Sequence, residues 1–220
     1  MPNQLTDYFP GVTFGNDVQI IGMNSTRIGR GSCIADHAWL NVCRRDGEPR
    51  LLIGRRVLVG RGSMLSSGGR LEIGDHCLLA PRVFVSDADH IYSNIARPYM
   101  DQGATAGVVV LEENCWLGIH AVVTGSITVG RGSVIAANAV VTRDVPPFCV
   151  VAGVPARIIQ MFNPGINTWE SADNETERER ITAIRMQNSL PSRDEYRRIL
   201  ERTRAGDTVD PLVAGRGQCL

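Results

Sequence analysis

Histidine titrates closer to neutral pH than other side chains, with an unperturbed pKa of about 6.5, so it is the first place to seek a proton-transfer group. His90 stands in the segment SDADH at residues 86–90, directly after Asp89 and near Asp87. A carboxylate beside an imidazole fixes its tautomer and stabilises the imidazolium, although two acids also simply solvate a loop. His90 is the candidate general base and Asp89 its candidate partner.

The other histidines share a different setting, because each follows an aliphatic residue by three positions. They are His37 after Ile34, His76 after Ile73 and His120 after Leu117. We expect these three to be exposed residues at chain corners. The spacings between successive histidines, 39, 14 and 30 residues, do not suit a histidine-bound zinc, and we expect no metal.

Large aliphatic side chains recur with a period of six residues. The longest unbroken run is Leu111, Leu117, Val123, Val129, Ile135 and Val141. Helices place apolar residues three and four apart and two-faced strands place them two apart, so neither explains the period. Short strands joined by tight corners do explain it, with the aliphatic residue pointing inward at each strand.

Extra residues interrupt the period after Ile20, Leu40, Leu65 and Val85, and three strands lie between successive interruptions. Three strands therefore complete one turn. A triangular coil places all four insertions along one edge, which is where repeat proteins often build a binding surface. The pattern predicts an all-β fold, a parallel β-helix of about six coils.

The longest insertion covers residues 86–110 and contains His90. A loop of this length in a compact fold is usually functional or disordered, and we expect function.

Charge and hydropathy narrow the class of partner. Lys plus Arg and Asp plus Glu are equal at 23 each, without a basic block, which argues against nucleic acid and anionic membrane as partners. No apolar run approaches the roughly 18–20 residues of a membrane span, so we expect no membrane insertion and a cytoplasmic location.

The stretch LEENCWLGIHAVVTGSITVGRGSVIAANAVVTRDVPPFCVVAGVPARII, residues 111–159, closely resembles the C-terminal signature of hexapeptide-repeat acetyltransferases. It particularly resembles the branch that contains maltose, galactoside and polysaccharide O-acetyltransferases. The resemblance covers roughly residues 12–160 and is most specific at NCWLG, VVTRDVPP and AGVPARII. It implies a left-handed parallel β-helix, a homotrimer with inter-subunit active sites, and acetyl-CoA (coenzyme A) as donor.

The same resemblance implies roles for individual residues. His90 matches the histidine that removes the proton from a sugar hydroxyl, and the backbone N–H of Ile119 matches the donor to the thioester oxygen. Trp116 lies along the pantetheine arm or caps a coil interface. The remaining matches to coenzyme-binding positions are Ala137, Thr142, Arg143 and Arg157.

The acceptor end departs from the galactoside and maltose branch. Those relatives carry an acidic residue just before the coil that starts at Ile73, whereas this chain has SSGGR at residues 66–70. A sugar of a surface polysaccharide or its precursor is therefore the expected acceptor. Ser66, Ser67 and Arg70 are the candidate contacts, although loop polarity alone accounts for the same residues.

Two regions are predicted. Residues 1–160 form the β-helix with its insertion, and residues 161–220 form a C-terminal helical extension with a flexible tail. Two short helices are expected there, over residues 174–190 and 192–204, the second opened by a capping box of Ser192 and Glu195.

The sequence thus predicts an acetyl-CoA-dependent sugar O-acetyltransferase. An N-acyltransferase of an amino sugar or other small amine remains an alternative, because the same coil and base suit an amine. A catalytically inactive β-helix scaffold is the third, since a fold does not guarantee an activity.

Overall fold

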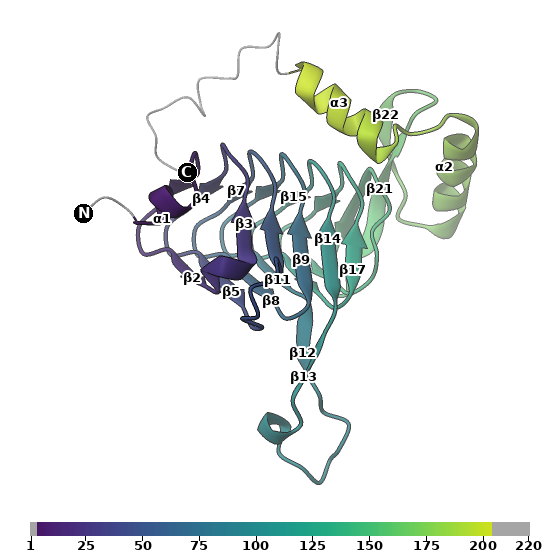
Figure 1. The fold of residues 1–220 in the computed structure, drawn as a ribbon. Coiled ribbons are helices and arrows are strands. Elements are labelled where there is room, and N and C mark those ends of the chain that lie inside the picture. The colour runs from purple at the N-terminus through teal and green to yellow at the C-terminus, as the bar shows by residue number, and fades with distance from the viewer. Residues whose placement is uncertain (1–3, 204–220) are drawn as a thin grey trace.

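The computed structural model describes residues 4–203, and the chain winds through three parallel sheets in turn to form a prism (Figure 1). Nearly every coil contributes one short strand to each sheet, so strands that are neighbours in a sheet come from successive coils. The sequence-based prediction of a parallel β-helix is confirmed.

The three sheets are named A, B and C in the order in which the chain visits them. The parallel strands of sheet A are β1 (Thr13–Phe14), β4 (Cys33–Ile34), β7 (Leu58–Val59), β10 (Leu78–Leu79), β15 (Trp116–Leu117), β18 (Val134–Ile135) and β20 (Cys149–Ala152). Sheet B contains β2 (Gln19–Ile21), β5 (Trp39–Val42), β8 (Met64–Ser67), β11 (Phe84–Ser86), β16 (Val122–Thr124) and β19 (Val140–Val141). Sheet C contains β3 (Thr26–Ile28), β6 (Leu51–Ile53), β9 (Arg70–Ile73), β14 (Val108–Leu111) and β17 (Ile127–Val129).

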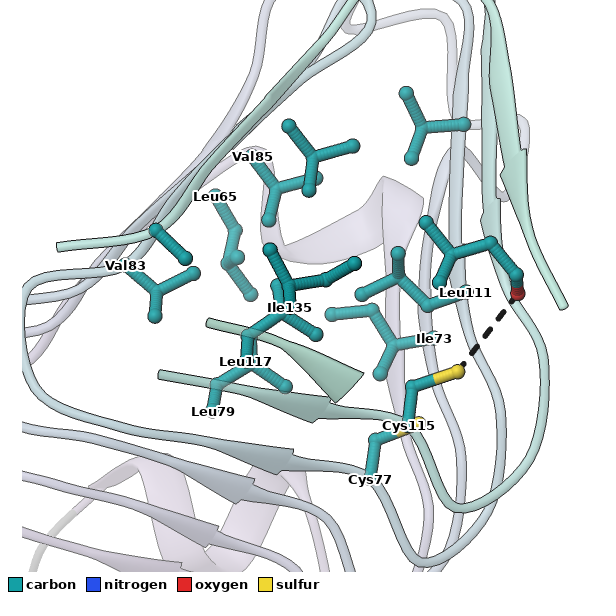
Figure 2. Close-up of a cluster of buried hydrophobic side chains, with 14 of the residues drawn as sticks. Leu65, Ile73, Cys77, Leu79, Val83, Val85, Leu111, Cys115, Leu117 and Ile135 are labelled. Atoms are coloured by element: carbon teal, nitrogen blue, oxygen red, sulfur yellow. Dashed lines mark hydrogen bonds between the residues drawn. The ribbon is translucent and has the colours of Figure 1, made fainter. Parts of the chain in front are cut away.

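The aliphatic residues of the six-residue period fill the prism interior. Figure 2 shows Leu79, Leu117 and Ile135 stacked from successive strands of sheet A, and all three are fully buried. Burying such a side chain contributes about 1.5–3 kcal/mol. The stacking of buried aliphatic side chains from successive coils therefore holds the coils in register.

The first coil is less completely buried than the others. Phe14, Ile20 and Ile28 are only partly covered, because no coil lies beneath them. The short helix α1 (Gln4–Tyr8) precedes Phe9 and Val12, which join the core at this end.

Histidines at the corners adopt the left-handed backbone conformation. The φ angles of His37, His76 and His120 are 57°, 64° and 59°, and His37 and His120 are exposed while His76 is half-buried. Their expected place at corners is confirmed, whereas the expected exposure is wrong for His76.

All four insertions lie on the edge between sheets B and C. Each follows a strand of sheet B and precedes a strand of sheet C, at β2–β3, β5–β6, β8–β9 and β11–β14. The first holds the short 3-10 helix Met23–Ser25. This common B/C edge is what the spacing of the interruptions predicts.

The C-terminal segment closes the last coil and then turns back along the prism (Figure 1). β20 pairs with β21 (Arg157–Asn163), which pairs with β22 (Thr168–Ser171), both antiparallel. The helices α2 (Glu175–Gln187) and α3 (Arg193–Thr203) follow, which confirms the prediction of short C-terminal helices. The predicted capping box is present, since the Glu195 amide donates to Ser192 Oγ at 3.3 Å and the Ser192 amide donates to Glu195 Oε2 at 2.7 Å.

Arginines of both helices fasten them to the β-helix. The guanidinium of Arg185 in α2 donates to the backbone oxygens of Pro147 and Phe148 at 3.1 and 2.7 Å. Arg193 and Arg197 of α3 both pair with the buried carboxylate of Glu113, at 2.9 and 2.5 Å. Among residues 4–203, no helix is long and apolar enough to cross a membrane.

Candidate active site

The insertion that contains His90 forms an arm that projects from the B/C edge (Figure 1). We define the arm as residues 87–107. Its strands β12 (Ala88–His90) and β13 (Ala104–Ala106) pair antiparallel, with His90 opposite Ala104, and the 3-10 helix Tyr99–Asp101 lies near its tip. A paired ribbon holds His90 at a defined distance from the coil, which a structureless loop does not.

His90 is exposed, and within the described residues no hydrogen bond or ion pair engages its ring nitrogens. Its backbone N–H donates to Asp89 Oδ1 at 2.8 Å. Asp89 therefore interacts with the main chain of His90 in this conformation, and the ring remains open to an incoming group.

Asp87, by contrast, is buried at the root of the arm. Its Oδ1 accepts from the Gly68 amide at 2.5 Å, and its Oδ2 accepts from the Gly69 amide and from Ser67 Oγ, both at 3.1 Å. Its backbone oxygen accepts from Gly107 N at 2.8 Å, where the arm returns to the coil. Asp87 thus connects both strands of the arm to the preceding coil.

The glycines at this root have no space for a side chain. A Cβ on Gly69 would lie 2.2 Å from the Gly107 oxygen, and one on Gly68 would lie 2.8 Å from Ala88 Cβ. The SSGGR segment therefore packs closely against the root of the arm. The Gly-Gly pair beside a strand was the available signal, since glycine there often marks a close backbone approach.

Candidate coenzyme contacts gather on another edge, between sheets A and B. Ile119 and Ala137 occupy the same corner position in successive coils, and the Asn138 N–H donates to the Ile119 oxygen at 2.9 Å. Among the described residues, neither the Ile119 N–H nor the Ala137 N–H has a protein acceptor, and both residues are exposed. Trp116 in β15 leads into this corner and is 50% exposed.

The remaining coenzyme candidates lie toward the C-terminal end. Thr142 and Arg143 follow β19, and Arg157 begins β21, where its guanidinium donates to the Ala156 oxygen at 2.9 Å. Within residues 4–203 neither arginine has an acidic partner. Unpaired guanidiniums of this kind suit phosphate groups, with which arginine forms strong charge-assisted hydrogen bonds.

Candidate acceptor contacts lie beside the arm root. Ser66 is half-buried and its Oγ accepts from Asn41 Nδ2 at 3.2 Å. Ser67 is fully buried, and its Oγ lies 3.1 Å from both the Arg50 oxygen and Asp87 Oδ2, which share its one proton, so its hydroxyl faces the interior. Arg70 is exposed and forms an ion pair with Glu72.

A single chain therefore brings the predicted residues together in separate groups. His90, Ser66 and Arg70 belong to the B/C edge, whereas Trp116, Ile119 and Ala137 belong to sheet A and the A/B edge. The width of sheet B separates the two groups. No group of three or more metal-ligating side chains occurs among the described residues.

The outer face of sheet B carries an apolar row that lies between these groups. Its members are neighbours in register on successive strands: Trp39, Met64, Phe84, Val122 and Val140. Met64 is 47% exposed. Such a row is typical of a surface that contacts another protein.

Comparison with known proteins agrees with the fold. Residues 109–143 match the family model for the bacterial transferase hexapeptide (six repeats). The fold is that of the left-handed parallel β-helix, and the predicted resemblance to hexapeptide-repeat acetyltransferases is confirmed.

Two curated relatives and one solved structure illustrate the similarity. The chain is 33% identical over 111 residues to the galactoside O-acetyltransferase of Escherichia coli, covering 50% of this chain and 54% of that protein. It is 33% identical over 109 residues to WbbJ of Escherichia coli, which carries the name of a lipopolysaccharide biosynthesis O-acetyl transferase, covering 46% and 56%. The chain therefore spans about half the length of these relatives.

The solved structure is that of AntD, an N-acyltransferase from Bacillus cereus in complex with dTDP and 3-hydroxybutyryl-CoA. Its TM-score is 0.63 at 19% identity, covering 82% of this chain and 95% of that one. This similarity shows that the two chains share a fold.

Proposed function

We propose that this protein is an acetyl-CoA-dependent O-acetyltransferase that modifies a sugar hydroxyl of a surface polysaccharide or its precursor in the cytoplasm. The observation that carries the proposal is an exposed histidine, His90, on a paired arm that is anchored to a hexapeptide-repeat coil. The similarity to sugar O-acetyltransferases supports the choice of acceptor.

His90 acts as the general base in the proposed reaction. Its unengaged ring accepts the proton of the acceptor hydroxyl while that oxygen attacks the acetyl carbonyl carbon, so the acetyl group moves directly to the sugar. A positioned base of this kind contributes about 10²–10⁴-fold to the rate. Asp89 is the candidate for orienting the ring once the acceptor is bound.

The Ile119 amide is the candidate donor to the carbonyl oxygen that gains negative charge. A backbone N–H without a protein acceptor, fixed at a coil corner, is preorganised for this role. The coenzyme supplies a thioester, which activates the acetyl group. Ala137 leaves room beside the corner for the pantetheine arm, with Thr142 nearby, and Arg143 and Arg157 are available to phosphates.

A homotrimer completes the site in this proposal. Because His90 and Ile119 lie on different edges of one prism, the arm of one copy serves the A/B edge of its neighbour, with Trp116 lining the cleft between them. The apolar row on sheet B, together with exposed Leu78 and Trp116 on sheet A, supports a contact between copies.

The acceptor is expected beside the arm root. Ser66 and Arg70 present polar groups there, and the buried hydroxyl of Ser67 supports the corner from inside.

The test compares three histidine variants in an assay for acceptor-dependent release of free CoA. His90→Asn lowers turnover at least about a hundredfold, as expected for loss of a general base, with little change in coenzyme affinity. His120→Asn tests the rival base, because His120 is exposed beside Ile119. His37→Asn is the matched control, since it has the same left-handed conformation on the same edge. Loss of turnover in His120→Asn but not in His90→Asn overturns the proposal.

A screen of acceptors with the unaltered protein separates hydroxyl from amine acceptors. Nucleotide sugars and oligosaccharides with and without amino groups are supplied with saturating acetyl-CoA. An ester product releases acetate in mild alkali and an amide does not. An amide product would replace the proposed reaction with N-acylation of an amino sugar.

A further inference from the structure

The buried side chain of Asp87 joins the arm that carries His90 to the preceding coil of the β-helix. Asp87 is 3% exposed, and its two carboxylate oxygens accept three hydrogen bonds from Ser67, Gly68 and Gly69. These donors belong to the corner of the preceding coil, 18–20 residues earlier in the chain. The carboxylate therefore spans two coils at the place where the arm begins.

This arrangement excludes the role that the sequence suggests most directly for an acid near a histidine. Both oxygens of Asp87 face the Ser67–Gly69 corner, and the side chain is buried while His90 is exposed. Asp87 therefore does not orient the imidazole by direct contact. Its effect on His90 passes through the backbone of the arm.

The main chain of Asp87 holds the other side of the arm as well. Its oxygen accepts from Gly107 N at 2.8 Å, and the Gly107 oxygen accepts from Arg70 N at 3.1 Å. Outgoing and returning strands are thus tied to the same corner. Arg50 braces that corner from the preceding insertion, since its Nη1 donates to the Gly69 oxygen at 3.0 Å.

We infer that Asp87 is a positioning residue: by locking the Ser67–Gly69 corner against the arm root, it fixes the direction in which the arm presents His90 to the acceptor. The inference rests on the proposed function, because it assigns a purpose to the direction of the arm.

A small tilt at the root is enough to misplace the base. His90 is three residues beyond Asp87 on a paired strand, about 10 Å away at 3.3 Å per residue. A tilt of about 10° then moves His90 by about 1.7 Å, and a displacement near 1 Å can cost about a hundredfold in rate. The rate is therefore much more sensitive to this carboxylate than coenzyme binding is.

The variant Asp87→Asn keeps the shape of the side chain but turns one acceptor oxygen into a donor. One of the amide donors of the corner then faces an NH₂ group and loses its hydrogen bond. We expect kcat to fall at least about tenfold while KM for acetyl-CoA stays within about twofold. We also expect faster hydrogen exchange of the Gly68, Gly69 and Gly107 amides in this variant.

Asp75→Asn is the matched control. Asp75 also accepts from the preceding coil, from the Arg55 amide at 2.7 Å and Arg55 Nε at 2.9 Å, but it lies on the C/A edge away from the arm. It reports the cost of a lost corner carboxylate without moving the arm. We expect unchanged kcat per folded molecule and unchanged exchange in residues 87–107.

Ser67→Ala is the milder variant if Asp87→Asn does not fold, because it removes one of the three hydrogen bonds and leaves the carboxylate. It is expected to lower kcat by a smaller factor and to raise exchange at Gly107.

Unchanged arm exchange in Asp87→Asn, or in Ser67→Ala if that variant replaces it, overturns the inference whatever the activity. A loss of kcat with equal loss of coenzyme binding overturns it also, because it indicates general misfolding. If the unaltered protein transfers no acetyl group, the proposed function fails, while the exchange data still decide whether Asp87 sets the arm.

Discussion

The closest backbone approach at the arm root gives the sharpest test of the structure. An alanine at position 69 would place its Cβ 2.2 Å from the Gly107 oxygen, whereas ordinary contacts begin at 3.4 Å. The difference, 3.4 − 2.2 = 1.2 Å, is the distance by which the returning strand must retreat. That oxygen also accepts from Arg70 N at 3.1 Å, so a retreat of this size breaks or lengthens that bond.

Overpacking of this kind costs about 1–3 kcal/mol. For a chain of this size about 1 kcal/mol lowers Tm by about 2–4 °C, so Gly69→Ala is expected to lower Tm by about 2–12 °C. Thermal unfolding measures the loss, and hydrogen exchange locates it in residues 87–107.

Gly165→Ala provides the control for Gly69→Ala. The nearest atoms to a Cβ at 165 are side-chain atoms of Asn163 and Ile184, each 3.2 Å away, and these can move aside. We expect a Tm change below about 2 °C, corresponding to less than about 1 kcal/mol. A Gly69→Ala protein with unaltered Tm and unaltered arm exchange would refute the description of the arm root as tightly packed.

Three further predictions concern the helices and the outer face. The pKa of Glu113 is lowered: burial raises it, but pairing with Arg193 and Arg197 outweighs burial. The stability from this carboxylate is therefore present above the unfolded pKa of about 4.3 and is lost as pH falls toward the lower folded value. Glu113→Gln should flatten the acid side of the stability profile in urea unfolding from pH 7 to pH 3, and an identical slope contradicts the pairing. Arg185→Met leaves backbone carbonyls of the last corner without their donor and should lower the free energy of unfolding by about 2–4 kcal/mol; a loss below about 0.5 kcal/mol would show that the contact is superficial. Val122→Asp places a charge in the apolar row of sheet B and should yield monomers in sedimentation velocity, whereas intact trimers would exclude that row from the interface.

The β-helix was predictable because its code is local. Each aliphatic residue marks a buried position in its own strand, and the six-residue spacing repeats this signal in every coil. Leu79, Leu117 and Ile135 illustrate this, since each is fully buried although none is adjacent to another in sequence. The common edge of the insertions followed from counting strands alone.

The arm root was not predictable in the same way, because its hydrogen bonds join residues about one coil apart. In the sequence, Asp87 is one of two acidic residues near His90, and the neighbouring residues do not distinguish its role from that of Asp89. Only the stacking of coils shows that Asp87 enters the interior while Asp89 remains outside. The SSGG segment likewise reads as a missing carboxylate, whereas the structure shows that the arm root packs there.

The positions of the arm and of the Ile119 amide along the prism axis constrain the proposed trimer. The arm leaves the coil that contains β10 and β11, and Ile119 belongs to the next coil, which contains β15. In a trimer with a threefold axis parallel to the prisms, every copy keeps its coils at the same height. The arm root of one copy and the Ile119 amide of its neighbour are then offset by one coil, about 4.8 Å. In the proposed trimer, His90 therefore has to reach across this offset from the arm of one copy to the neighbouring A/B edge.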